Sequence, residues 1–272
     1  MRRSFFRASG GACFLFWAHS LVFLPEFTVS IFYAIMKDTG KGRRTSEDSM
    51  EKKKFAAAIT DLLLALIGCL FILSASVVLV LNIRVIYYHD IDTLHLTKEV
   101  ELTKEQIREN YDALIDYNLF WKGEDTLQFP DFPMSEHGQI HFAEVRRIFV
   151  ALQYLMIGSA AVFFIGEWGK LRRGSRRSLK LTAILAIVLP LAAGAMIASN
   201  WEAFFVGFHH VMFSNDYWLF DPATDPVILI LPDAFFLHCA LAILICVLAG
   251  SALCMGGYCL AANRKNKRKQ QE

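Results

Sequence analysis

The segment FAAAITDLLLALIGCLFILSASVVLVLNI, residues 55–83, is long and apolar, and its one carboxylate, Asp61, lies near the Lys-rich start. A helix of about 20 apolar residues crosses about 30 Å of hydrocarbon, so this segment predicts a membrane-spanning helix. Three further apolar segments of suitable length follow at residues 148–168, 181–200 and 234–261. The sequence therefore predicts an all-α integral membrane protein with four transmembrane helices.

The composition agrees with this class. The 272 residues are 55% hydrophobic, above the 45–50% that is usual for soluble domains, and the mean hydropathy is +0.37. The net charge of +2 gives no reason to expect a nucleic-acid partner. All six cysteines lie in apolar segments or at their ends, so we interpret them as small hydrophobic residues and not as a disulfide framework or a thiolate metal site.

The positive charges predict the orientation. Lys and Arg cluster at residues 52–54, 170–180 and 263–272, which share one side of a four-span arrangement. The positive-inside rule makes that side cytoplasmic. We therefore expect a multi-pass protein of the plasma membrane, with both termini cytoplasmic and with residues 84–147 and 200–233 on the extracytoplasmic face.

The chain divides into three parts. Residues 1–49 hold short apolar pieces interrupted by polar residues, and Met50 then opens a short basic stretch before the first span. We expect Met50 to be the native start and residues 1–49 to be an extension from a misplaced start codon. The alternative is a genuine additional hydrophobic hairpin or span. Residues 50–262 form the four-span membrane domain, and residues 263–272 form a basic cytoplasmic tail.

The first outward segment contains an amphipathic-helix loop region. Thr103 and Gln106 have the spacing of a capping box, and apolar residues recur at helical spacing after them, so residues 103–118 predict a helix. Its apolar face packs on the protein or lies in the membrane interface. A Pro-rich turn then ends at Gly138, and a new helix is expected to start near Gln139 and to continue into the second span.

Histidines are concentrated in or beside the outward segments, which hold seven of the eight: His89, His95, His137, His141, His209, His210 and His238. His141 directly precedes the second span, with Glu144 at i+3, where a carboxylate can fix the imidazole tautomer. His209 follows the third span, in an aromatic and turn-rich stretch, residues 201–236. Because these two spans are antiparallel, both imidazoles should lie at one depth and could serve one acid–base site.

Several neighbouring residues are further candidates. Arg146 stands at an outer helix end, where it could meet an anionic headgroup. Asp216 and Trp218 either shape the site or belong to a buried turn. Asp221 and Asp225 each precede a proline and are most simply turn formers.

Two other functions remain open from the residues alone. His137, His141, His209 and His210 could bind zinc in a metal-dependent membrane hydrolase, but adjacent histidines do not easily reach one ion and HExxH is absent. The second alternative is a non-catalytic transport or accessory protein. The scarcity of polar residues inside the spans, such as Asp61 and Gln153, argues against a transport path.

Two long strings carry a resemblance to a known family. They are FPDFPMSEHGQIHFAEV, residues 129–145, preceded by Tyr117 and Asn118, and FHHVMFSNDYWLFDPATDPVILILPDAFF, residues 208–236. This pattern resembles the lipoprotein intramolecular transacylases, called Lit, which are four-span membrane enzymes of low-GC Gram-positive bacteria. The resemblance covers about residues 52–262 and leaves residues 1–49 outside.

The resemblance implies a reaction. The partners would be membrane lipid and lipoproteins whose N-terminal cysteine carries an S-diacylglyceryl group. The sn-2 acyl chain would move to the free α-amine of that cysteine, giving the lyso form, and no metal or organic cofactor is needed. The family's two catalytic histidines match His141 and His209. We expect the substrate to be contacted by Glu144, Arg146, His210, Asp216, Trp218, Tyr117 and Asn118.

The chemistry of an amine attacking an ester requires a base of near-neutral pKa, stabilisation of an oxyanion and protonation of the leaving alkoxide. One of the two histidines would act as the base and the other as the acid or oxyanion partner. A covalent acyl-imidazole is a further possibility. The sequence does not assign these roles.

Overall fold

The structure is a computed structural model, and it describes residues 46–122 and 125–269. The chain divides into two units, Met1–Ala57 and Ala58–Glu272, which are described separately. In the first unit, the described part is the beginning of helix α2 (Ser46–Asn82). The prediction about residues 1–49 therefore falls almost entirely outside the described residues. The account that follows concerns the second unit.

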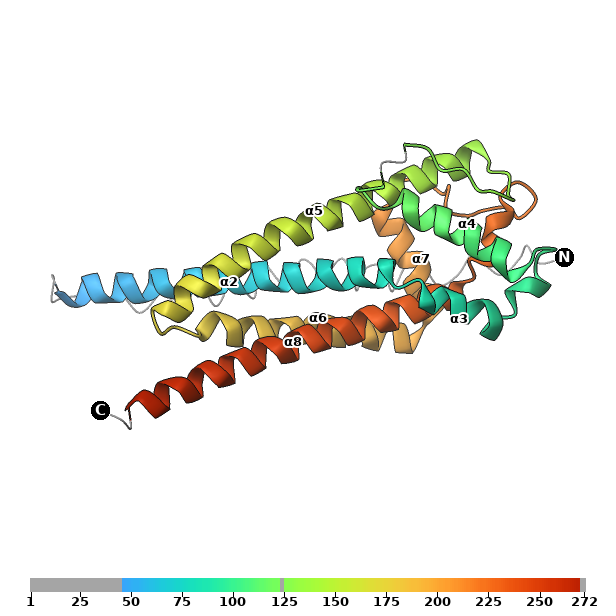
Figure 1. Cartoon of the computed structure of the whole chain (residues 1–272). Coiled ribbons are helices and arrows are strands. Elements are labelled where there is room, and N and C mark those ends of the chain that lie inside the picture. Colours follow the sequence, from blue (N-terminus) through green and yellow to red (C-terminus); the bar gives the residue numbers. More distant parts are fainter. Residues whose placement is uncertain (1–45, 123–124, 270–272) are drawn as a thin grey trace. The chain divides into compact units, whose positions relative to one another are not determined.

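Four long helices, α2 from Ala58 onward, α5 (Glu136–Arg172), α6 (Arg177–Ser199) and α8 (Asp233–Lys269), form the main body of this unit (Figure 1). Each has an apolar stretch long enough to cross a membrane, as the four predicted spans require. The helices pack through two small clusters of buried side chains. These are Leu64, Phe163 and Leu179, with Tyr258 against them, and Ile72, Ala186 and Val247.

One ion pair joins two of the long helices at the end near the turn between α5 and α6. The Nζ atom of Lys170 donates to Asp61 Oδ1 over 2.6 Å, and Asp61 is buried. A buried carboxylate is stable as an anion only when it is paired and hydrogen-bonded. The structure thus gives Asp61 a partner within the protein.

The largest hydrophobic core lies at the opposite end, where α2 ends and α5 and α8 begin. We call it the end core; its central residues are Tyr87, Ile91, Ile107, Tyr111, Phe142, Ile230 and Phe235. They come from short elements as well as the long helices: α3 (Val85–Thr93), η1 (Leu96–Lys98), α4 (Lys104–Tyr117) and η2 (Pro226–Ile230). Tyr87 stacks on Tyr111 with ring centroids 3.7 Å apart, and its hydroxyl donates to the Ile230 carbonyl over 2.8 Å.

Helix α4 confirms the predicted amphipathic helix. Thr103 is its N-cap, and both hydrogen bonds of the capping box with Gln106 are formed. The apolar face carries Ile107, Tyr111, Leu114 and Ile115, and all four side chains are buried in the end core. Of the two alternatives for this face, the structure supports packing on the protein.

The predicted start of α5 near Gln139 is wrong, because the helix begins at Glu136. The Ser135 side chain caps it by accepting a hydrogen bond from the Gly138 N–H over 3.0 Å. Gly138 therefore lies in the first turn. A Cβ there would collide with the Asp225 carboxylate, so the glycine permits a close approach between segments and does not stop a helix.

The beginning of the turn-rich stretch is also different from the prediction. Residues Trp201–Met212 form a helix, α7, directly after α6. Asn200 is the one non-helical residue between them, with φ −165° and ψ 100°, and its side chain accepts a hydrogen bond from the Ala203 N–H over 2.9 Å. An asparagine N-cap of this kind starts a new helix in a new direction.

Candidate active site

His141 and His209 come together at the end of the unit that holds the end core. His141 is in the second turn of α5, and His209 is in the last turn of α7. Their ring centroids lie 6.3 Å apart with the planes tilted by 31°. The structure thus brings the two predicted histidines to one place.

The His141 ring is enclosed by aromatic side chains and is 6% exposed. Phe213 and Phe220 contact it edge-on, at centroid distances of 4.7 and 5.4 Å. Its Nδ1 atom is buried and has no hydrogen-bond partner among the described residues. A buried nitrogen without a hydrogen-bond partner is destabilising. A polar group that enters the site and forms a hydrogen bond with Nδ1 would therefore be bound favourably.

The His209 ring is held by a backbone carbonyl and an indole. Its Nδ1 atom lies 2.8 Å from the Phe205 carbonyl oxygen, and the Trp218 ring stacks on it at 4.6 Å. A carbonyl oxygen can only accept, so Nδ1 carries the hydrogen and Nε2 of the neutral ring has the free lone pair. Burial lowers the pKa of His209 from its ordinary value, with a smaller contribution from His210 in the same direction and an opposing one from the Phe205 hydrogen bond. The ring is therefore neutral at neutral pH.

The carboxylate of Glu144 is hydrogen-bonded to Asn215, whereas the sequence predicted His141 as its partner. Its carboxylate accepts hydrogen bonds from the Asn215 side-chain amide at 3.1 and 3.2 Å. The Asn215 carbonyl oxygen in turn accepts from the Tyr217 N–H over 3.1 Å, and His137 stacks on Tyr217 at 4.1 Å. These contacts fasten residues 213–220, which we call the site turn, to the first turns of α5.

The other candidates of the second string divide into buried and exposed residues. Trp218 is buried between the two adjacent histidines, stacked on His209 and in edge contact with His210 at 5.5 Å. His210 and Asp216 are exposed. Trp218 therefore positions the His209 ring, while His210 and Asp216 present polar atoms beside the site.

Arg146, Tyr117 and Asn118 form a separate group. The Arg146 Nε atom donates to the Tyr117 carbonyl over 2.8 Å, and its guanidinium lies 4.8 Å from the centre of the Tyr117 ring. The Gln153 amide donates to the Asn118 carbonyl over 2.8 Å. These contacts join the end of α4 to α5 and reach neither His141 nor His209.

Sequence reasoning missed three residues that organise the site: Phe205, Asn215 and Asp225. Asp225 is 2% exposed, and it accepts from the Ser135 N–H and the Thr224 hydroxyl, each over 2.8 Å. It therefore fixes the start of α5, whereas Asp221 accepts from the Ala223 N–H in a local turn, as predicted. The close approach between Gly138 and Asp225 is visible only in the structure, and no sequence spacing indicates it.

The arrangement of possible metal ligands bears on the zinc alternative. Within residues 46–122 and 125–269, no group of three or more His, Cys, Asp or Glu side chains is close enough to hold a metal ion. His137, one of the four candidate ligands, faces Tyr217 in the stacking contact described above.

Comparison with known proteins gives one family. The family model of the lipoprotein intramolecular transacylase Lit matches residues 62–236. Three solved structures of the membrane-integral Lit from Bacillus cereus are similar. The first is 36% identical, with a TM-score of 0.76, and covers 79% of this chain and 99% of that chain.

The other two structures are single-histidine variants of the same Bacillus cereus protein. A histidine-to-arginine variant is 34% identical over 82% of this chain and 100% of that chain, with a TM-score of 0.75. A histidine-to-alanine variant is 35% identical over 80% and 99%, with a TM-score of 0.73. A search of curated proteins found no match.

Proposed function

The chain belongs to the Lit family of lipoprotein intramolecular transacylases, and we propose that it moves the sn-2 acyl chain of a diacylglyceryl-modified lipoprotein to the α-amine of the modified cysteine. Family membership favours this acyl transfer over a metal-dependent hydrolase and over a transport or accessory role. The observation that carries the proposed mechanism is the pair of imidazoles 6.3 Å apart, one of which has a free Nε2.

The reaction conserves all atoms of the substrate. The amine nitrogen attacks the sn-2 ester carbonyl and forms a tetrahedral oxyanion. The carbon–oxygen bond to glycerol then breaks, the amide bond remains, and the proton lost by the amine is returned to the glycerol oxygen. Because donor and acceptor are on one molecule, correct positioning supplies much of the rate enhancement.

His209 is suited to be the base. The hydrogen bond to the Phe205 carbonyl leaves Nε2 as the acceptor nitrogen, and a lowered pKa keeps the ring unprotonated at neutral pH. Stacking on Trp218 fixes the direction in which Nε2 points. The imidazolium formed when His209 takes the amine proton can then protonate the glycerol oxygen, which completes the transfer.

His141 is suited to be the oxyanion partner. Its ring is close enough for one carbonyl group to contact both histidines, and its buried Nδ1 has no partner among the described residues. The aromatic side chains around it exclude water, which strengthens a hydrogen bond to developing negative charge. A covalent route in which Nε2 of His209 first takes the acyl chain uses the same geometry.

The remaining candidates act in two ways in this proposal. Glu144 and Trp218 hold the site turn and the His209 ring. His210 and Asp216 are exposed beside the site and contact the peptide that follows the modified cysteine. Arg146, with Tyr117 and Asn118, also acts by positioning, because its contacts join the end of α4 to α5.

The orientation in the membrane is part of the proposal. The basic residues at 170–180 and beyond 263 favour a cytoplasmic location for that end of the helices. The active site at the other end then faces outward, where mature lipoproteins with a free α-amine are found. A protease or labelling reagent added outside intact cells should reach the site turn and should not reach residues 170–180.

The test uses a synthetic diacylglyceryl lipopeptide and the purified full chain. Substrate and product are isomers of equal mass, so fragment-ion spectra must locate the acyl chain on the N-terminal nitrogen. We expect N-acylation by the wild type and its loss in His209→Ala and His141→Ala. His95→Asn, which changes an exposed histidine outside the site, is the matched control.

A mixture of two lipopeptides, one with deuterated acyl chains, tests whether transfer stays within one molecule. We expect each product to keep its own label. Exchange of labels between peptides would contradict the intramolecular route, and unchanged N-acylation in either alanine variant would remove that histidine from the mechanism.

A further inference from the structure

A second histidine–carboxylate pair lies outside the active site. The His238 Nδ1 atom, in the second turn of α8, is 2.8 Å from Asp90 Oδ2 of α3. The other oxygen of Asp90 accepts from the Thr93 hydroxyl over 3.2 Å. The Asp90 side chain is 3% exposed, whereas the His238 side chain is 42% exposed. The carboxylate is therefore enclosed, and the outer edge of the imidazole is open.

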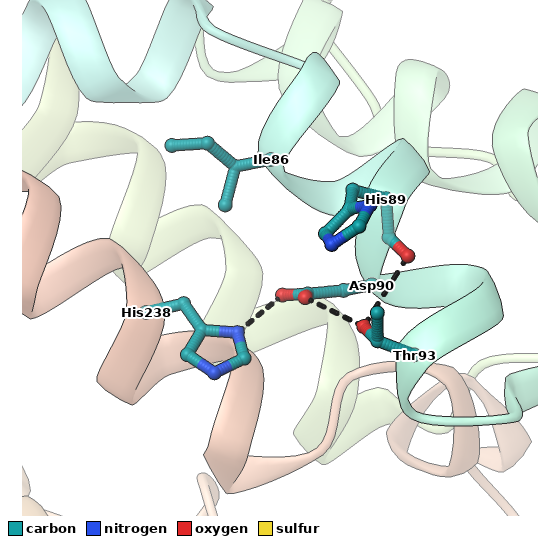
Figure 2. Close-up of a pocket in the computed structure, with 5 residues that line it drawn as sticks. All are labelled: Ile86, His89, Asp90, Thr93 and His238. Atoms are coloured by element: carbon teal, nitrogen blue, oxygen red, sulfur yellow. Dashed lines mark hydrogen bonds and ion pairs between the residues drawn. The ribbon is translucent and has the colours of Figure 1, made fainter.

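The open edge faces a cavity of about 510 Å³ lined by Ile86, His89, Asp90, Thr93 and His238. Figure 2 shows the rings of His89 and His238 on different sides of the Asp90 side chain, with Ile86 above them. Neither histidine of the active site lines this cavity. It is a separate site.

The arrangement of polar atoms selects the charge of a ligand. Both oxygens of Asp90 accept hydrogen bonds from side chains of the protein, and the carboxylate is almost fully buried. Because Nδ1 of His238 is the atom bound to Asp90, Nε2 at the open edge is the nitrogen left for a ligand. An anion bound there is held by the protonated form of His238, whose Nε2–H points outward as a charged donor with the exposed His89 ring beside it.

The neighbouring surface of α8 identifies the source of the anion. Leu241 and Ile245 follow His238 at i+3 and i+7, on the same side of the helix. They are 44% and 66% exposed and lie farther along the apolar span. An acyl chain lying on them would place its headgroup at His238. A free phosphate ion would make no use of this apolar surface.

We propose that the cavity between α3 and α8 binds the phosphodiester headgroup of a phospholipid, with His238 Nε2 and His89 as donors and with an acyl chain along Leu241 and Ile245. The bound lipid packs against the α3 side of the end core. This site goes beyond the acyl transfer proposed above, because none of its residues contacts the transferred chain.

The experiment measures binding of dioleoyl phosphatidylglycerol to the delipidated full chain by native mass spectrometry and by equilibrium titration. The informative variant is His238→Asn, whose side-chain amide replaces Nδ1 as the donor to Asp90 and removes Nε2. Charge-assisted hydrogen bonds predict a weakening of about tenfold or more. His95→Asn should bind as the wild type does.

Two further probes identify the ligand. Dioleoylglycerol has the same chains without a phosphate, and inorganic phosphate has the charge without the chains. We expect both to compete at least tenfold less well than the phospholipid. Equal competition by dioleoylglycerol would show a purely apolar site, equal competition by phosphate would show a small-anion site, and unchanged affinity in His238→Asn would remove the histidine; each result overturns the proposal.

The outcome is distinguishable from that of the acyl-transfer test. His238→Asn should retain helical circular dichroism and the N-acylation of a detergent-solubilised lipopeptide, because the cavity and the active site share no residue. Absence of N-acylation by the wild-type chain, with its phospholipid binding intact, would instead count against the proposed function alone.

Discussion

The Nδ1 atom of His209 lies 2.8 Å from the carbonyl oxygen of Phe205, one helical turn earlier in α7. This bond decides which nitrogen of the ring is available for chemistry. Since the carbonyl cannot donate, the hydrogen is on Nδ1, and Nε2 is left as an acceptor. A local contact within one helix thus prepares His209, before any substrate arrives, for the role of base that we propose.

Replacing His209 by Asn or by Gln should separate positioning from proton transfer. Asn can keep a donor to the Phe205 carbonyl, and Gln places an amide near the position of Nε2, but neither is a base. We expect both variants to fold and to lose about 10²–10⁴-fold in rate. Rates of N-acylation from fragment-ion spectra measure this. An Asn variant that keeps more than a tenth of the wild-type rate would contradict a base at Nε2.

The pH dependence should report the lowered pKa of His209. The free α-amine of the substrate titrates at about 7.7–8.0 and an ordinary histidine at about 6.5. As the pH falls, the logarithm of kcat/KM should decline with unit slope once the amine is protonated. It should steepen to a slope of two only below 6.5, where His209 gains its proton. Steepening at or above that value would show an unshifted base.

The donor and acceptor side chains of the hydrogen bonds between Glu144 and Asn215 should be interchangeable. Asn215→Asp places two carboxylates together and should detach the site turn, with a loss of about tenfold or more because a charged hydrogen bond contributes about 1.5–3 kcal/mol. The double variant Glu144→Gln/Asn215→Asp restores a donor facing a carboxylate with the partners reversed. It should recover most of the rate and of the melting temperature. A double variant no better than Asn215→Asp would show that Glu144 has another role.

Gly138→Ala should destabilise the start of α5, because the added methyl group collides with the Asp225 carboxylate that holds the Ser135 N–H. Overpacking of this kind costs about 1–3 kcal/mol, and both thermal stability and N-acylation should fall. Gly158→Ala in the same helix is the control, since its methyl group meets nothing within 4 Å. Equal melting temperatures for the two variants would rule out the collision.

Much of the fold is readable from the sequence, because its causes are local. Span length, the capping box at Thr103 and the clusters of basic residues each depend on neighbours in the chain. The meeting of His141 with His209 was also predictable, since two antiparallel spans bring their adjoining ends to one level. The strings that resemble the Lit family added the reaction.

The remaining parts of the site depend on contacts between distant segments. Asn215 binds Glu144, and Asp225 binds the start of α5 across Gly138. No spacing rule signals such pairs. The Phe205 bond was missed for another reason: residues 201–212 are rich in aromatic side chains and were interpreted as irregular, whereas the Asn200 cap makes them helical.

The single residue between α6 and α7 has a mechanical consequence. Helix α6 has 23 residues, which at 1.5 Å per residue gives a length of about 35 Å. One extended residue, Asn200, is all that separates it from the helix that carries His209. Inserting one residue into α6 would turn α7 by about 100° and carry the imidazole away from His141. The thickness of the surrounding bilayer influences the tilt of α6. The placement of His209 relative to His141 should therefore depend on bilayer thickness.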